Sequence, residues 1–145
     1  TAKPGQAMSS TTAGYSGTPL SKKLGIKTGS RVLPRNPPED YLRLLQPLAD
    51  DVVMEKRLTR KTDIVHVFVT RRKSLSAELE SLRHAIRADA AVWVSWPKAA
   101  SGVETDIVEG TIRELCLPLG FVDVKVCAVD AVWSGLKLVI RRELR

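Results

Sequence analysis

The loop between residues 96 and 104 carries the side chains with the clearest binding chemistry. Lys98 lies three residues before Ser101, and Ser101 with Glu104 forms the S-x-x-E pattern that starts many helices. The first N–H groups of a helix have no internal partner, so together with a lysine they attract an anion. Arg71, in the loop after the preceding strand pattern, would add a second cation. The pattern predicts an anion site, and the plainer alternative is a capped helix beside a solvated Lys98.

Two tryptophans and their polar neighbours form the second group of candidates. Trp96 ends one strand pattern and Trp133 follows another. The two indoles either wall a pocket for a flat ligand or a partner, or close the end of the core. Asp130 ends a buried strand pattern and would pair with a lysine or serve as a functional acid. Ser134 has no histidine within sequence reach, and the G-x-S-x-G elbow of hydrolases is absent.

The tentative ligand-binding set lies in loops that follow strand patterns, where open parallel sheets bind ligands. It comprises Asn36, Arg71, Trp96, Lys98, Ser101, Gly102, Asp130, Trp133 and Ser134. His66 falls in mid-strand, which indicates a core residue with one satisfied nitrogen, and His84 lies on the polar side of a helix. Cys116 and Cys127 are expected to be buried small apolar residues. With no nucleophile–base pair and no metal-ligand spacing, no catalytic residue, metal or cofactor is expected.

Continuous apolar, β-branched runs predict the strands that hold these loops. Residues 64–70 and 91–96 are typical of strands buried on both faces of a parallel sheet. Further strands are expected at residues 31–35, 52–55, 122–129 and 136–142. Helices are expected after Thr18-Pro19, over residues 41–48, from Ser74 with the stripe Leu75, Leu79, Leu82 and Ile86, and after Ser101 with the stripe Val108, Ile112, Leu115 and Leu119. The alternation predicts an α/β fold: a three-layer, mainly parallel Rossmann-like sheet with a C-terminal antiparallel hairpin.

Length and charge distribution bound the organisation of the chain. The 145 residues suit one domain, expected over residues 15–145, after a disordered N-terminal arm over residues 1–14. Six basic and no acidic residues lie in the first 35 positions, which indicates a solvated leader or, alternatively, a contact with nucleic acid. No apolar run reaches the ~18 residues of a membrane span, and the first residues lack a signal-peptide core. The expected location is the cytoplasm.

The segment from Leu24 to Leu33 resembles the entry to the first strand of S-adenosylmethionine-dependent methyltransferases, and the last two strand patterns resemble the end of that fold. The family places a glycine-rich turn after the first strand, whereas this chain reads Pro34-Arg35-Asn36-Pro37-Pro38. Proline has no N–H and a fixed negative φ, so this turn is not expected to hold the cofactor in the family's manner. Glu55 would take the place of the family's ribose-binding acid.

Three segments are similar to a bacterial family known as domain of unknown function 3052. They are Tyr15-Ser16-Gly17-Thr18-Pro19-Leu20 with Lys22-Lys23-Leu24-Gly25-Ile26, then Val94-Ser95-Trp96-Pro97-Lys98 with Ser101-Gly102, and Val124-Lys125-Val126-Cys127-Ala128-Val129-Asp130 with Trp133-Ser134-Gly135-Leu136-Lys137. The resemblance implies a compact, stand-alone cytoplasmic protein and brings no activity with it.

The functional expectation follows from the missing glycine turn and the absence of a catalytic constellation. The sequence favours a non-catalytic binding or regulatory domain on a degenerate methyltransferase-like scaffold, with a small anionic ligand or a protein partner. The alternative is an enzyme or cofactor-binding protein with an unrecognised site at the carboxyl ends of the strands. Nucleic acid and membrane are not expected as partners.

Overall fold

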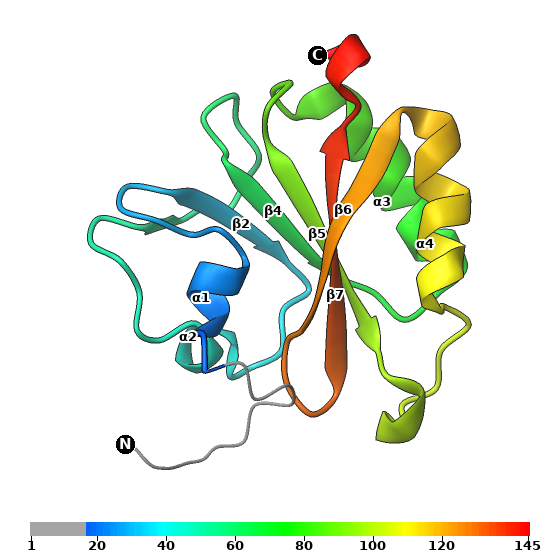
Figure 1. The fold of residues 1–145 in the computed structure, drawn as a ribbon, viewed down its shortest axis with the longest axis horizontal. Helices are drawn as coiled ribbons and strands as arrows, with labels where there is room; N and C mark the ends of the chain where they lie inside the picture. The colour runs from blue at the N-terminus through cyan, green and yellow to red at the C-terminus, as the bar shows by residue number, and fades with distance from the viewer. Residues whose placement is uncertain (1–16) are drawn as a thin grey trace.

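A single six-stranded sheet organises the computed structural model, which describes residues 17–145 (Figure 1). Its strands are β2 (Arg31–Arg35), β3 (Val53–Met54), β4 (Ile64–Phe68), β5 (Ala91–Pro97), β6 (Phe121–Ala128) and β7 (Trp133–Ile140). They lie in the order β3-β2-β4-β5-β7-β6. The first four are parallel, and β7 runs antiparallel between β5 and β6. The predicted mainly parallel sheet with a C-terminal hairpin is confirmed, whereas the predicted arm over residues 1–14 lies outside the described residues.

Helices cover both faces of this sheet. They are α1 (Leu20–Lys23), α2 (Tyr41–Leu44), α3 (Arg72–Ala85) and α4 (Glu109–Cys116), with 3-10 turns η1 (Ala99–Ser101), η2 (Leu117–Leu119) and η3 (Arg142–Leu144). Figure 1 shows α1 and α2 on one face and α3 and α4 on the other. Within residues 17–145, no helix is both long and apolar enough to cross a membrane.

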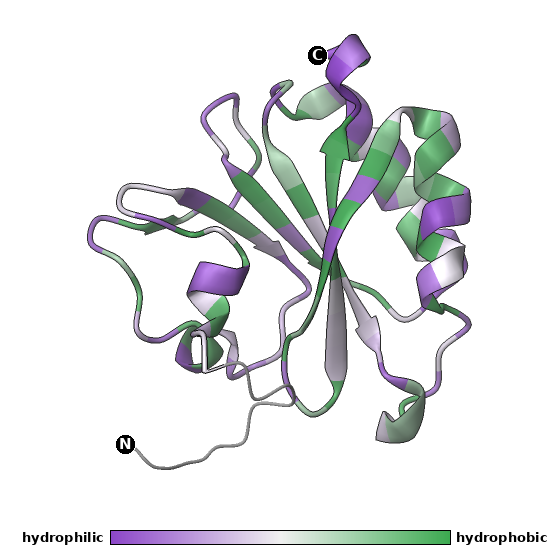
Figure 2. Cartoon of the chain, in the orientation of Figure 1, coloured by the Kyte–Doolittle hydropathy of each residue, from purple (hydrophilic) through white to green (hydrophobic). Residues whose placement is uncertain are grey.

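Alternation along the strands divides the apolar side chains between two cores. Val65 and Val67 of β4 pack with the stripe Leu75, Leu79 and Leu82 of α3. Ile64 and Phe68 of the same strand belong to the other core, together with residues of α1 and α2. All of β4 and β5 is therefore buried, and Figure 2 shows the apolar colour concentrated along the central strands.

The starts of the two long helices differ from the sequence prediction. Helix α3 begins at Arg72, so Ser74 lies inside its first turn. The Arg72 N–H instead donates to the carboxylate of Asp106 at 2.6 Å, a cap supplied by a distant loop. Helix α4 begins only at Glu109, and Ser101 belongs to η1, which ends at Gly102 with φ 78°. The predicted S-x-x-E start was wrong because the left-handed Gly102 stops the chain after one 3-10 turn.

Candidate functional site

The carboxyl ends of β2 and β4 lie at the point where the direction of the chain connections reverses. From β2 the chain continues to β3 on one side, and from β4 it crosses to β5 on the other. Ligands of open α/β sheets bind in the crevice at such a switch point. A cavity of about 470 Å³ lies here, lined by Arg35, Asn36, Val69, Ser74, Ala77, Glu78 and Ser81.

The sequence of α3 explains why this place is hollow. The helix buries the stripe Leu75, Leu79 and Leu82, and a second stripe runs beside it at spacing three, one and three. That second stripe consists of Ser74, Ala77, Glu78 and Ser81. Three of its members are small, so the helix leaves space next to the end of β2.

Asn36, the first residue after β2, has a φ of 56° and thus a left-handed backbone. Asparagine is among the few side chains that adopt this conformation readily. The prolines predicted a turn without a positive φ, and at Asn36 that prediction was wrong. Pro37 and Pro38 flank the turn on its far side and supply no N–H donor, so the donors that remain here belong largely to side chains.

The charged groups of the cavity are one arginine and one glutamate. Arg35 Nη1 contacts Glu78 Oε1 at 3.0 Å, and the Glu78 side chain is 19% exposed. The second carboxylate oxygen of Glu78 has no partner among residues 17–145. A carboxylate with a free oxygen at the switch point is able to accept hydroxyl donors from a ligand.

Glu55, which the methyltransferase resemblance suggested as a ribose acceptor, has a protein partner at each of its carboxylate oxygens. Its Oε2 pairs with Arg31 at 3.1 Å, and its Oε1 accepts the Thr62 hydroxyl at 2.5 Å. These contacts hold the short strand β3 against the start of β2 and the loop before β4. Glu78, which was not among the candidates from the sequence, is the acid that the fold brings to the cavity.

The groups predicted to form an anion site make internal contacts instead. Lys98 Nζ donates to the Asp130 carbonyl at 2.7 Å, and the Ser101 hydroxyl donates to the Lys98 carbonyl at 2.7 Å. Arg71 lies 3.5 Å from the exposed Glu104. Because α4 starts only at Glu109, Ser101 does not cap that helix. The structure holds Gly102 as the stop of η1, and a binding role for this loop stays a prediction.

The two predicted indoles do not share a pocket. Trp96 is 7% exposed and belongs to the core under α3 and α4. Trp133 packs on the opposite core and meets Phe68 edge-on, with ring centroids 5.1 Å apart. Alternation explains the separation, because Trp96 pairs with Ser134 and Trp133 with Pro97, which puts the indoles on opposite faces. Asp130 Oδ1 accepts the N–H groups of residues 132 and 133, at 2.9 and 2.8 Å, and so shapes the β6–β7 turn.

A buried polar chain runs through the core beneath α2, and only its histidine was singled out from the sequence. The Tyr41 hydroxyl and His66 Nδ1 are 2.9 Å apart, and His66 Nε2 and the Ser95 hydroxyl are 2.7 Å apart. Both ring nitrogens are thus satisfied, where the sequence predicted one. Burial lowers the pKa of His66 to about 3 and raises that of Tyr41 above its usual range. Within the described part of the chain, no cluster of His, Cys, Asp and Glu could hold a metal ion.

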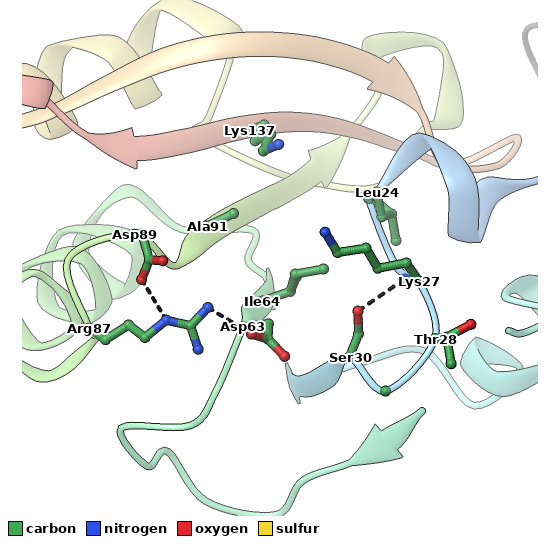
Figure 3. Close-up of a pocket in the computed structure, with 12 residues that line it drawn as sticks. Leu24, Lys27, Thr28, Ser30, Asp63, Ile64, Arg87, Asp89, Ala91 and Lys137 are labelled. Carbon is green, nitrogen blue, oxygen red and sulfur yellow. Dashed lines mark hydrogen bonds and ion pairs between the residues drawn. The ribbon is translucent and has the colours of Figure 1, made fainter. Parts of the chain in front are cut away.

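A second cavity, of about 510 Å³, lies at the opposite, amino edge of the parallel strands (Figure 3). Arg87 forms one wall and pairs with Asp63 at 2.7 Å and Asp89 at 2.5 Å. Figure 3 shows Lys27 extending into the hollow from the loop after α1, with Lys137 of β7 on another side. No sequence motif marks this place, because its residues come from loops and strands that are far apart in the sequence.

Several solved structures that share this fold are methyltransferases. A putative type 11 methyltransferase from Sulfolobus solfataricus is 13% identical, with a TM-score of 0.59 over 83% of this chain and 89% of that one. A SAM-dependent methyltransferase from Aquifex aeolicus is 14% identical, with a TM-score of 0.60 over 83% and 87%. A TehB-like SAM-dependent methyltransferase from Corynebacterium glutamicum is 12% identical, with a TM-score of 0.51 over 84% and 85%. No protein-family model matches the chain, and no curated protein matches its sequence.

These likenesses correct the functional expectation. The sequence favoured a non-catalytic binding or regulatory domain, chiefly because the turn after β2 contains prolines and no glycine. The structural neighbours are methyltransferases, and the left-handed geometry is present at Asn36. The alternative, an enzyme or cofactor-binding protein with its site at the carboxyl ends of the strands, is the better-supported interpretation.

Proposed function

We propose that the protein is an enzyme of the methyltransferase class that holds S-adenosylmethionine in the cavity between the carboxyl ends of β2 and β4. The observation that carries the proposal is a left-handed Asn36 opening onto a cavity at the switch point of the sheet. The shared fold of the methyltransferase structures supports the same place.

The residues present suit a nucleoside-bearing ligand held mainly by side chains. The free carboxylate oxygen of Glu78 would accept ribose hydroxyl groups, and the Asn36 amide would both donate and accept. Val69 offers an apolar wall, and the Arg35 ion pair fixes the Glu78 carboxylate in one orientation. The cofactor, when bound, supplies an electrophilic methyl group on sulfur. The prolines after Asn36 restrict the turn to one shape, which limits the ordering cost of binding.

Calorimetric titration with S-adenosylmethionine and S-adenosylhomocysteine tests the proposal. The unaltered protein is expected to bind both, and Glu78→Gln to weaken binding about tenfold, since a charged acceptor is lost. Asn36→Val is expected to weaken it further, because valine disfavours a positive φ and carries no amide. Glu80→Gln, an exposed change on the same helix, is the matched control. Absence of heat with both ligands, or an equal loss in the control, would contradict the proposal.

Three finer features belong to the same proposal. Membership in domain of unknown function 3052 is supported by the three sequence segments that resemble it. A cytoplasmic location is supported by two cysteines that are free, Cys116 buried and Cys127 half-buried. A single domain beginning near residue 15 is supported by the one sheet that both cores share.

A further inference from the structure

The cavity at the amino edge contains two lysines that have no acidic partner. Every ion pair among residues 17–145 joins an arginine to an acid, so none of them involves Lys27 or Lys137. Neither side chain makes a hydrogen bond within this part of the chain. The two acids of the cavity, Asp63 and Asp89, are both held by Arg87 on another wall. An excess of positive charge therefore remains around Lys27 and Lys137.

Lys137 occupies a position where the strand would ordinarily carry an apolar residue. It pairs directly with Trp93 of β5, and so it lies on the face of the sheet that packs under α1. Trp93 is completely buried, and its indole N–H donates to the Leu24 carbonyl at 3.0 Å. Lys137 is half-buried beside that indole, and no acid among residues 17–145 pairs with it, so its charge is not neutralised. A ligand anion would neutralise it.

The loop between α1 and β2 forms a polar part of the wall, and hydrogen bonds fix its turn. The turn before β2 is closed by the Ser30 hydroxyl, which accepts the Lys27 N–H at 3.0 Å, and by the Ser30 N–H, which donates to the Lys27 carbonyl at 2.9 Å. Thr28 lies at the rim beside Lys27 (Figure 3). Two ammonium groups at a hollow of about 510 Å³ suit a compact dianion with a small organic part.

We propose that this cavity binds a small phosphorylated compound, with its phosphate group between Lys27 and Lys137. A phosphate monoester carries nearly two negative charges at neutral pH, which matches two lysines better than a single carboxylate does. The site lies at the edge of the sheet opposite to the proposed cofactor cavity, and it does not depend on that proposal.

Titration with pyrophosphate and with inorganic phosphate, followed by calorimetry at physiological salt, tests the site. The unaltered protein is expected to bind pyrophosphate saturably, and Lys27→Gln and Lys137→Gln each to lower the affinity roughly tenfold. Lys73→Gln, an exposed lysine of α3 on the other face, is the control and is expected to bind as the unaltered protein does. Circular dichroism of each variant shows whether weaker binding comes from loss of the site or from loss of the fold. If Lys137→Gln does not fold, the affinity of Lys27→Gln, a change in an exposed turn, still tests the site.

A single-stranded oligonucleotide forms the second arm, because nucleic acid offers the same phosphate chemistry. We expect it to leave pyrophosphate binding unchanged. Displacement of pyrophosphate by the oligonucleotide, with an affinity that falls steeply with salt, would assign the lysines to a polyanion and overturn the proposal. Equal affinities in the lysine variants and the control would overturn it as well.

Discussion

His66 is completely buried in the centre of β4, with a partner at each ring nitrogen. Both partners are neutral hydroxyl groups, so no acid stabilises a charged imidazolium at this buried position. Burial accordingly lowers its pKa to about 3. In the unfolded chain the same side chain titrates near its ordinary value of about 6.5. At the scale of one residue, this difference links folding to pH.

Between those two pKa values, the unfolded chain binds a proton that the folded chain does not. The free energy of unfolding is therefore expected to fall as the pH drops from about 6.5 towards 3, by at most about 1.4 kcal/mol per pH unit from this group. Denaturant unfolding of His66→Gln and of the exposed His84→Gln, between about pH 7 and pH 5, checks it. The first variant should flatten the slope, and an unchanged slope would exclude His66 as its source.

The hydrogen bond between Tyr41 and His66 can be tested at a single pH by measuring stability. Replacing it with phenylalanine leaves His66 Nδ1 buried without a partner, so Tyr41→Phe is expected to cost about 1–3 kcal/mol of stability at neutral pH. Urea unfolding of this variant beside the unaltered protein measures the loss. A change within error would show that the Tyr41–His66 contact contributes nothing to stability.

At the scale of the elements, one loop secures the start of another element's helix. The chain before α4 runs past the end of β4, where the Thr105 hydroxyl donates to the Thr70 carbonyl at 2.7 Å. The next residue, Asp106, accepts the first N–H of α3. The negative charge also meets the positive end of the helix dipole. Helix α3 thus depends on a residue more than thirty positions later in the chain, and α3 is the helix that forms the wall of the proposed cofactor cavity.

Asp106→Ala removes that cap and is expected to lower the free energy of unfolding by about 1–2 kcal/mol. Glu104→Ala, two residues earlier, removes only an exposed ion pair with Arg71 and should change stability by less than about 0.5 kcal/mol. Thermal and urea unfolding of both variants gives the comparison. Equal losses would mean that the cap has no special role.

The same elements show what local sequence can predict. The bounds of the strands at residues 64–68 and 91–97 were predicted within two residues, because short, continuous apolar runs with β-branched residues favour strands buried on both faces. The start of α4 was missed because a capping pattern also fits a 3-10 turn, and a left-handed Gly102 decided between them. Of the switch-point cavity, Asn36 was proposed from sequence, whereas Glu78 was not. Glu78 reaches the cavity only because α3 lies beside the end of β2, a contact that no local pattern records.

At the scale of the whole molecule, the two cores share every central strand. Trp96 reports on the core under α3 and α4, and Trp93 and Trp133 report on the other. We expect tryptophan fluorescence and far-ultraviolet circular dichroism to give one coincident unfolding transition. Single-tryptophan variants that keep Trp96 or Trp133 test each core in turn. Transitions with separate midpoints would mean that the two faces unfold independently and would contradict a single domain.

The place of β7 in the sheet has a consequence for synthesis. Strand β5 is buried on both faces, and the edge that does not pair with β4 pairs with β7, which comes from residues 133–140. As the chain leaves the ribosome, β5 emerges more than thirty residues before its neighbour does. During that interval the backbone N–H and C=O groups along this edge of β5 are unpaired and can pair with other nascent chains. They are satisfied within the chain only when the β6–β7 hairpin has been synthesised.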